Sequence, residues 1–125
     1  MIMTIGSMFS FDAAHKLPDE EKYGKCKNLH GHRYDVEIQV KGEVESSGWL
    51  CDFHVLKDEV NTVLNTLDHS YINDVVTIPT VENIIIYVYQ KIKDKIEDLG
   101  VSIYKIRIYE TKNCYAEILC EDDKQ

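Results

Sequence analysis

Long hydrophobic runs are absent from this 125-residue sequence. The longest apolar stretch, IIIYVY at residues 84–89, is far shorter than the roughly 20 residues that a membrane-spanning helix requires. The first fifteen residues also lack the basic start and the continuous apolar block of a secretory signal peptide. We therefore expect a cytoplasmic protein with no membrane partner.

Positive charge is also in short supply. The chain has 14 lysine and arginine residues against 22 aspartates and glutamates, a formal net charge of −8. Such a chain repels a phosphate backbone, which argues against nucleic acid as a partner. Residues 16–33 are an exception, because their five cations outnumber three anions, and either a solvated loop or an anion-binding site accounts for this. The five cations are Lys16, Lys22, Lys25, Lys27 and Arg33.

Proline and glycine are sparse, with 2 and 6 residues, and the sequence has no repeat, low-complexity stretch or linker. Its length is typical of one domain, so we expect a single domain over residues 1–125. Cysteines of cytoplasmic proteins are usually reduced. We therefore expect free thiols at Cys26, Cys51, Cys114 and Cys120.

Periodicity predicts four strands and two helices. Apolar residues alternate loosely over 2–11 and strictly over 34–41, and residues 101–109 and 114–120 form two further β-type runs around a short turn. Helical spacing covers 53–67, after the N-cap candidate Asp52, and 81–99, between Thr80 and Gly100. The order ββααββ predicts an α+β fold, an antiparallel four-stranded sheet with two helices packed on one face. Its exposed edges favour a closed oligomer.

Three histidines are candidate metal ligands. His30 and His32 flank Gly31 at the start of a predicted strand, and residues two apart on a strand point to the same face. His15 follows the first predicted strand, and antiparallel pairing would bring it beside them. Three imidazoles without a fourth protein ligand are typical of a catalytic zinc site, whose open position takes water or substrate.

Cys26 lies four residues before His30 and has two interpretations. It could be a fourth metal ligand, which would close the site. Alternatively, Lys25 and Lys27 beside it, together with a nearby metal, could favour the thiolate and let it act as a base.

Two acidic positions also remain open. Asp68 could orient the imidazole of His69, although a histidine at a helix end is more simply explained by the helix dipole. Glu110 could be an ordinary turn residue or could bind a planar amidine-like edge through both carboxylate oxygens. His54, early in the first helix, is expected on the surface.

Six sequence blocks carry a resemblance that runs nearly end to end: FDAAHKLP, CKNLHGHRYDVEI, GWLCDF, LDHSYIND, PTVEN and the YET of residues 109–111. With them the sequence resembles the 6-pyruvoyl-tetrahydropterin synthase family, and its short spacer between Cys26 and His30 is similar to the queuosine-pathway branch, the 6-carboxy-tetrahydropterin synthases. The resemblance implies a tunnelling fold and a homo-hexamer, a dimer of trimers with sites between subunits.

The resemblance also implies roles for individual residues. It implies Zn²⁺ on His15, His30 and His32, a base thiol at Cys26 supported by Asp68 and His69, and pterin binding by Glu110 with Thr80 nearby. The implied lyase converts 7,8-dihydroneopterin triphosphate to 6-carboxy-5,6,7,8-tetrahydropterin, acetaldehyde and triphosphate. Two alternatives stand beside it: a 6-pyruvoyl-tetrahydropterin synthase of the biopterin branch, and a non-enzymatic oligomeric metal-binding protein.

Overall fold

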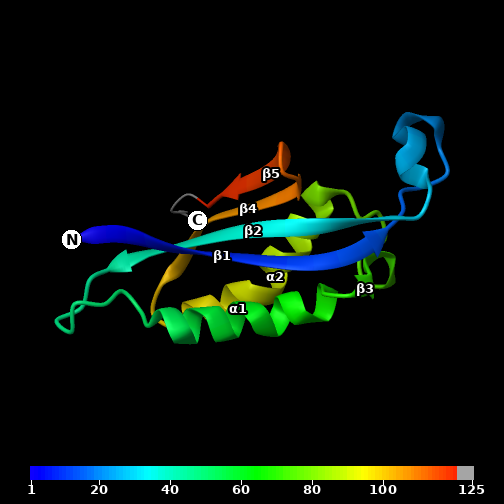
Figure 1. The fold of residues 1–125 in the computed structure, drawn as a ribbon. Coiled ribbons are helices and arrows are strands. Elements are labelled where there is room, and N and C mark those ends of the chain that lie inside the picture. Colours follow the sequence, from blue (N-terminus) through cyan, green and yellow to red (C-terminus); the bar gives the residue numbers. More distant parts are fainter. Residues whose placement is uncertain (121–125) are drawn as a thin grey trace.

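The computed structural model of the chain describes residues 1–120. Its strands are β1 (Ile2–His15), β2 (His30–Glu43), β3 (Ser70–Tyr71), β4 (Ser102–Thr111) and β5 (Cys114–Leu119). Its helices are α1 (Phe53–Leu67) and α2 (Val81–Glu97), with short 3-10 helices η1 (Glu21–Lys27) and η2 (Ile72–Asp74). A curved sheet forms one layer and the two α-helices form the other (Figure 1). No helix within residues 1–120 is long and apolar enough to cross a membrane.

A long hairpin of β1 and β2 forms the centre of the molecule. The two strands pair antiparallel from Ile2 opposite Glu43 to His15 opposite His30. Both strands extend beyond the predicted ranges 2–11 and 34–41. Those ranges were predicted from the alternation of apolar and polar residues. This alternation weakens at the polar residues that end each strand, so the prediction stopped short of the true ends. The β2 residues predicted to face the core are fully buried: Tyr34, Val36, Ile38 and Val40.

The sheet has five strands in the order β3-β1-β2-β4-β5. The predicted four-stranded antiparallel sheet is therefore wrong in this detail, because β3 pairs parallel to β1, with Ser70 opposite Ala13. A two-residue strand carries no periodicity, and its partner lies more than 50 residues away in the sequence. The α+β class is confirmed, with a mixed rather than an antiparallel sheet.

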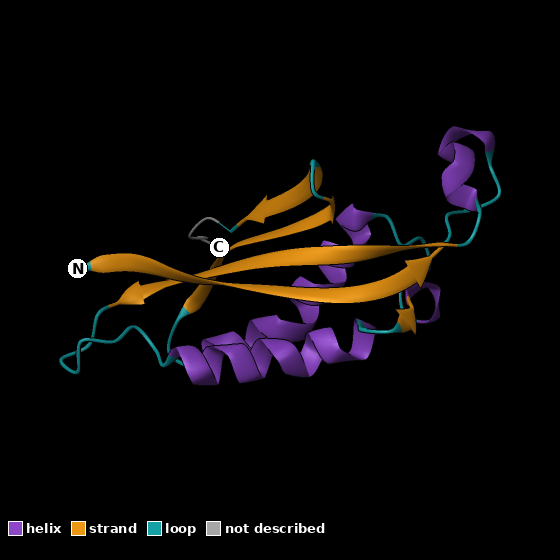
Figure 2. Ribbon diagram, in the orientation of Figure 1, coloured by secondary structure: helices purple, strands orange, loops and turns teal. Residues whose placement is uncertain are grey.

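Both α-helices cover the same face of the sheet (Figure 2). Each begins at its predicted N-cap, since the Asp52 carboxylate accepts a hydrogen bond from the backbone N–H of His54 and the Thr80 hydroxyl accepts one from that of Asn83. Helix α2 ends two residues earlier than predicted, and Gly100 has the left-handed φ of 87° that favours glycine after a helix. Both helices bury their apolar stripe against the inner sheet face, with α1 contributing Leu56, Val60, Val63, Leu64 and Leu67.

The connection between β1 and β2 carries η1 and projects from the end of the hairpin (Figure 1). The backbone N–H of Leu17 donates to the carbonyl of Cys26 over 2.8 Å and closes the base of this excursion. Residues 17 and 26 are thereby brought close, although nine positions separate them in the sequence. All four cysteines are free thiols, as predicted.

Candidate metal and active site

Three histidines meet at the end of the central hairpin, on the sheet face that carries the helices. His15 is the last residue of β1 and pairs directly with His30, the first residue of β2. His32 follows on the same face because side chains two apart on a strand point the same way. One ring nitrogen from each histidine lies within 4.8 Å of the others. His15 is fully buried, and His32 is about one-fifth exposed.

Backbone carbonyls set the orientation of two imidazoles. His15 Nδ1 lies 2.7 Å from the carbonyl oxygen of Pro79, and His30 Nδ1 lies 2.7 Å from that of Asn28. Because a carbonyl can only accept a hydrogen bond, both Nδ1 atoms are protonated donors and both Nε2 atoms carry lone pairs. These two Nε2 atoms face each other at 2.9 Å.

Two facing lone pairs at this distance repel unless a cation or a proton lies between them. A metal ion relieves the repulsion, and a carbonyl-bound second ring nitrogen is the usual support of a metal-binding histidine. Burial also lowers the pKa of both His15 and His32, which favours the neutral imidazole that coordinates metals. The three residues therefore fit a metal ion that prefers imidazole ligands.

Tyr34 completes the floor of this histidine cluster. Its hydroxyl lies 3.4 Å from both ring nitrogens of His15, and its ring packs edge-on against His15 and His32. Burial raises the pKa of the Tyr34 hydroxyl far above its ordinary value, so the phenol stays neutral. Tyr34 was not predicted as a site residue, although its spacing of two from His32 placed it on the same face of the strand.

Glu110 lies beside the histidines at the end of β4. Its Oε2 atom is 3.7 Å from His15 Nε2 and 3.8 Å from His32 Nε2. Its carboxylate raises the pKa of both histidines, a smaller effect than the lowering by burial. Glu110 therefore lies within a strand and within 4 Å of two histidines, a contact that the sequence did not indicate.

Asp68 and His69 form a second cluster at the outer edge of β1. Asp68 Oδ1 accepts a hydrogen bond of 2.9 Å from the backbone N–H of Asp12, and the backbone N–H of His69 donates to the carbonyl of Asp12. His69 Nδ1 lies 3.1 Å from Asp68 Oδ1. The hydrogen bond from Asp12 is the main cause of the lowered pKa of Asp68, followed by that from His69.

A left-handed backbone explains how these two neighbours contact each other. His69 has a φ of 57° and is the one non-glycine residue with positive φ in the described part of the chain. This conformation costs roughly 1–3 kcal/mol for a non-glycine residue and often marks a functional position. The helix dipole still favours a histidine at this end of α1, whereas Asp68, the C-cap of α1, lies where the dipole disfavours an anion.

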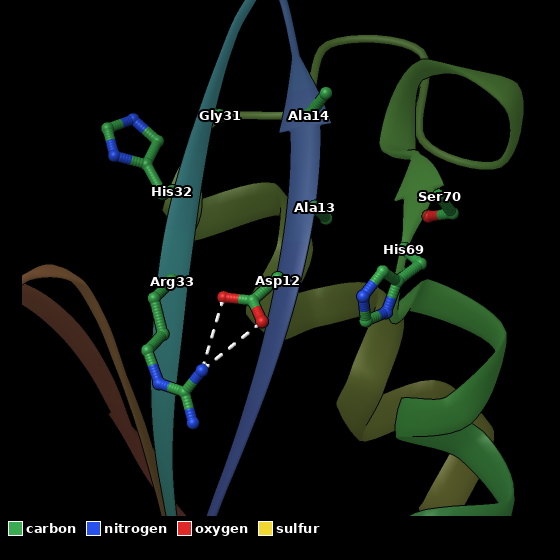
Figure 3. Close-up of a pocket in the computed structure, with 8 residues that line it drawn as sticks. All are labelled: Asp12, Ala13, Ala14, Gly31, His32, Arg33, His69 and Ser70. Atoms are coloured by element: carbon green, nitrogen blue, oxygen red, sulfur yellow. Dashed lines mark hydrogen bonds and ion pairs between the residues drawn. The ribbon is translucent and has the colours of Figure 1, made fainter.

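A pocket of about 520 Å³ lies against this second cluster and includes Asp12, Arg33, His69 and Ser70 (Figure 3). Asp12 and Arg33 are ion-paired at 3.2 Å and occupy the sheet face opposite to the buried residues. His32, in contrast, projects from β2 away from His69 (Figure 3). The two clusters share no residue. The two clusters are therefore separate sets of possible ligand atoms, although His32 and His69 both line this pocket.

The remaining predicted site residues lie around these clusters. Cys26 is exposed on η1 and is a member of neither cluster, which gives no support to its interpretation as a fourth ligand. Thr80 caps α2 and follows Pro79, whose carbonyl binds His15. His54 is exposed, as expected. Asp12 and Pro79 were missed because their partners lie more than 50 positions away in the sequence.

Comparison with known proteins provides independent evidence about the family of this chain. The family model for 6-pyruvoyl tetrahydropterin synthase matches residues 4–121. The chain is 37% identical over 116 residues to a putative 6-carboxy-5,6,7,8-tetrahydropterin synthase of Archaeoglobus fulgidus, covering 93% of this chain and 95% of the relative. It is 35% identical over 101 residues to the dihydroneopterin monophosphate aldolase of Pyrococcus furiosus, covering 81% and 83%.

The fold agrees with these sequence matches. The structure of 6-pyruvoyl tetrahydropterin synthase from Caenorhabditis elegans superposes with a TM-score of 0.87 at 33% identity, over 97% of each chain. The tetrahydropterin synthases among these relatives are lyases, so a non-enzymatic metal-binding protein no longer competes as an interpretation. This chain belongs to the 6-pyruvoyl tetrahydropterin synthase family of pterin lyases.

Proposed function

We propose that this chain is a cytoplasmic, zinc-dependent 6-carboxytetrahydropterin synthase of queuosine and 7-deazapurine biosynthesis, acting as a single domain over residues 1–125. It converts 7,8-dihydroneopterin triphosphate to 6-carboxy-5,6,7,8-tetrahydropterin, acetaldehyde and triphosphate. The observation that carries the proposal is the histidine cluster, in which two Nε2 lone pairs face each other at 2.9 Å. The relative from Archaeoglobus fulgidus, named as a putative enzyme of this kind, supports the branch.

In this proposal His15, His30 and His32 hold the zinc ion. Zinc bound there acts as a Lewis acid on the side-chain hydroxyls of the substrate. Burial lowers the pKa of His15 and His32, and the carbonyls of Pro79 and Asn28 orient the rings of His15 and His30. Glu110 adds a negative charge within 4 Å of two of the ligands.

Proton transfer is assigned to Cys26, Asp68 and His69. The Cys26 thiolate takes a proton from the substrate side chain, and the Asp68 and His69 pair passes protons to and from it. The hydrogen bond from the Leu17 N–H to the Cys26 carbonyl supports this role. Leu17 lies two residues after His15, so this bond ties the segment that carries the thiol to the end of β1. The 3.1 Å contact between Asp68 and His69 supports theirs.

Substrate orientation is assigned to Glu110 and Thr80. A carboxylate recognises a planar N–H edge such as an aminopyrimidine through two parallel hydrogen bonds. Glu110 is about 29% exposed, so its carboxylate remains accessible beside the histidines. Thr80 lies one residue after Pro79, whose carbonyl binds His15, and this places its backbone at the same rim.

A complete site in this proposal needs more than one chain, in a homo-hexamer built as a dimer of trimers. Asp68 and His69 belong to a cluster separate from the histidines of their own chain, and the His69 side chain is 79% exposed. Its imidazole is therefore free to reach the histidine cluster of a neighbouring chain. The open edge of β5 offers backbone groups for pairing between chains.

Two other pterin reactions compete with the proposal, each favoured by one relative. The structural match to a 6-pyruvoyl tetrahydropterin synthase favours the biopterin branch, which uses the same substrate. The relative from Pyrococcus furiosus is an aldolase of dihydroneopterin monophosphate.

Mass spectrometry of the products tests the proposal. The purified protein is given dihydroneopterin triphosphate and dihydroneopterin monophosphate in separate reactions. We expect 6-carboxytetrahydropterin and acetaldehyde from the triphosphate and little turnover of the monophosphate. Accumulation of 6-pyruvoyl-tetrahydropterin would assign the chain to the biopterin branch, and preferred cleavage of the monophosphate would assign it to the aldolases.

A further inference from the structure

A small pocket of about 180 Å³ lies at the base of the η1 excursion. Its lining includes Lys16, which follows His15, and Lys27, which follows Cys26. The hydrogen bond from Leu17 to Cys26 brings these two lysines to one place. Two cations of the positive segment that the sequence left unexplained thus line one pocket.

The backbone of Lys16 is held firmly from the opposite side of the pocket. Its N–H donates to Asn73 Oδ1 over 3.0 Å, and Asn73 Nδ2 donates to its carbonyl over 2.8 Å. This pair of hydrogen bonds fixes the base of the Lys16 side chain. Asn73 and the exposed Thr77 also line the pocket and add polar groups to it.

The pocket is cationic within an acidic protein. The Lys16 ammonium has no ion-pair partner among residues 1–120. Lys27 contacts Asp19 at 3.5 Å, but the Asp19 side chain is 94% exposed, and such a surface pair contributes little. An incoming polyanion would therefore displace Asp19 from Lys27 at low cost.

The larger pocket beside His69 is a poorer site for an anion. Its one arginine, Arg33, is already bound by Asp12 at 3.2 Å and by Ser10 at 3.1 Å. Asp68 belongs to the cluster of Asp12 and His69 beside this pocket, and its lowered pKa means that it keeps its negative charge. In the lining of the larger pocket one carboxylate, Asp12, offsets one arginine, whereas the lining of the smaller pocket has two lysines against one aspartate.

We propose that Lys16 and Lys27 bind the phosphate chain of the substrate, with Asn73 positioning Lys16. The inference rests on the proposed function, because it is the pterin triphosphate that would carry this chain. The ligand chemistry is a flexible polyphosphate, which lysines bind as mobile point charges. Lys16 follows His15 and Lys27 follows Cys26 in the chain, so phosphates bound there would extend from the proposed reaction site toward η1.

Isothermal titration of the assembled protein with inorganic tripolyphosphate tests this subsite. We expect K16M and K27M each to weaken binding roughly tenfold, and the double variant to weaken it further, because each substitution removes one charge-assisted contact to the anion. The matched control is K57M, which removes an exposed lysine of α1 and should bind as the native chain does. Unchanged binding by the double variant, or equal loss in K57M, would overturn the subsite.

Turnover separates this inference from the proposed function. If the native protein makes no tetrahydropterin yet loses tripolyphosphate binding in the double variant, the subsite stands and the proposed function falls. If turnover occurs, we expect the double variant to raise KM for dihydroneopterin triphosphate much more than it lowers kcat. Native KM in an active double variant would overturn the subsite and leave the proposed function intact.

Discussion

Single residues of the histidine cluster differ in how firmly the chain holds them. His15 is fully buried, with Pro79 and Tyr34 around it, so its removal would disturb packing as well as metal binding. His32 is partly exposed, and His30 is held mainly by its bond to the Asn28 carbonyl. His30 is therefore the better position at which to test metal binding by itself.

We expect His30→Ala to lower the metal content and the turnover together, because two imidazoles hold zinc much less tightly than three. Native chains should carry about one zinc each, measured by elemental analysis after gel filtration. His54→Ala is the matched control, because this exposed histidine lies outside the cluster. Full zinc occupancy after replacement of His15, His30 and His32 together would place the metal elsewhere.

Cys26 is predicted to move protons and not to hold metal. We expect Cys26→Ala to keep its zinc and to lose on the order of 10²- to 10⁴-fold in kcat, the usual contribution of a positioned general base. Zinc content and turnover are measured on the same sample. Parallel loss of both would identify the thiol as a ligand, and native turnover would make it irrelevant.

The other three cysteines provide controls for this variant. Cys51 and Cys120 are partly buried against the core, and burial raises the pKa of both thiols, so they stay protonated. Cys114 is exposed at the start of β5. We expect alanine at any of these positions to leave kcat near its native value, with stability altered more than turnover at the two partly buried ones.

At the scale of elements, the N-caps of the two α-helices allow an effect on stability to be distinguished from an effect on substrate binding. Asp52 caps α1 and Thr80 caps α2, each through one side-chain hydrogen bond to the backbone. The Asp52 cap lies at the opposite end of α1 from Asp68. Thr80 adjoins Pro79 and is also proposed to bind substrate, so the two caps have similar structural roles and different proposed functional ones.

We expect Thr80→Ala and Asp52→Ala each to lower the free energy of unfolding by about 1 kcal/mol, the usual cost of a lost N-cap. Thermal unfolding at one fixed protein concentration measures this, because assembly shifts the midpoint. Only Thr80→Ala should also raise KM for the pterin. Thr80→Ser should restore both properties, since serine caps helices as well as threonine does. An equal KM in both alanine variants would reduce Thr80 to a cap.

For the whole molecule, the separation of the two clusters predicts a composite site. Sedimentation should show a closed multimer, because the sheet of one chain leaves open edges. The proposed function predicts that this multimer is a hexamer. A fully active monomer would contradict this arrangement. The separation also predicts complementation between two inactive variants.

In the proposed function, chains with His30→Ala lack a metal ligand and chains with His69→Ala lack part of the proton shuttle. When the two are unfolded together and reassembled, about one site in four should combine native halves, so activity should return to roughly a quarter of the native value. Each variant refolded alone is the control and should stay inactive. Failure of the mixture to regain activity, with multimers present, would show that each site uses one chain only.

Local sequence determined the elements whose signals are periodic or positional. The strict alternation from Tyr34 fixed which face of β2 is buried, and the caps Asp52 and Thr80 located both helix starts. Antiparallel pairing of the first two strands was enough to predict that His15 meets His30. The family also followed from sequence blocks alone and is confirmed. The roles of the site residues and the single domain stay predictions.

Tertiary structure decided what depends on partners distant in the sequence. Strand β3 exists because Ser70 pairs with Ala13, and the contact between Asp68 and His69 exists because Asp12 binds the Asp68 carboxylate and the His69 N–H while a left-handed turn aligns the two side chains. The position of Glu110 beside the histidines depends on contacts between separate segments of the chain. The same holds for the positions of Lys16 and Lys27 in the pocket at the base of η1. Periodicity records which way one segment faces, whereas such contacts depend on how separate segments pack, and no local pattern encodes that packing.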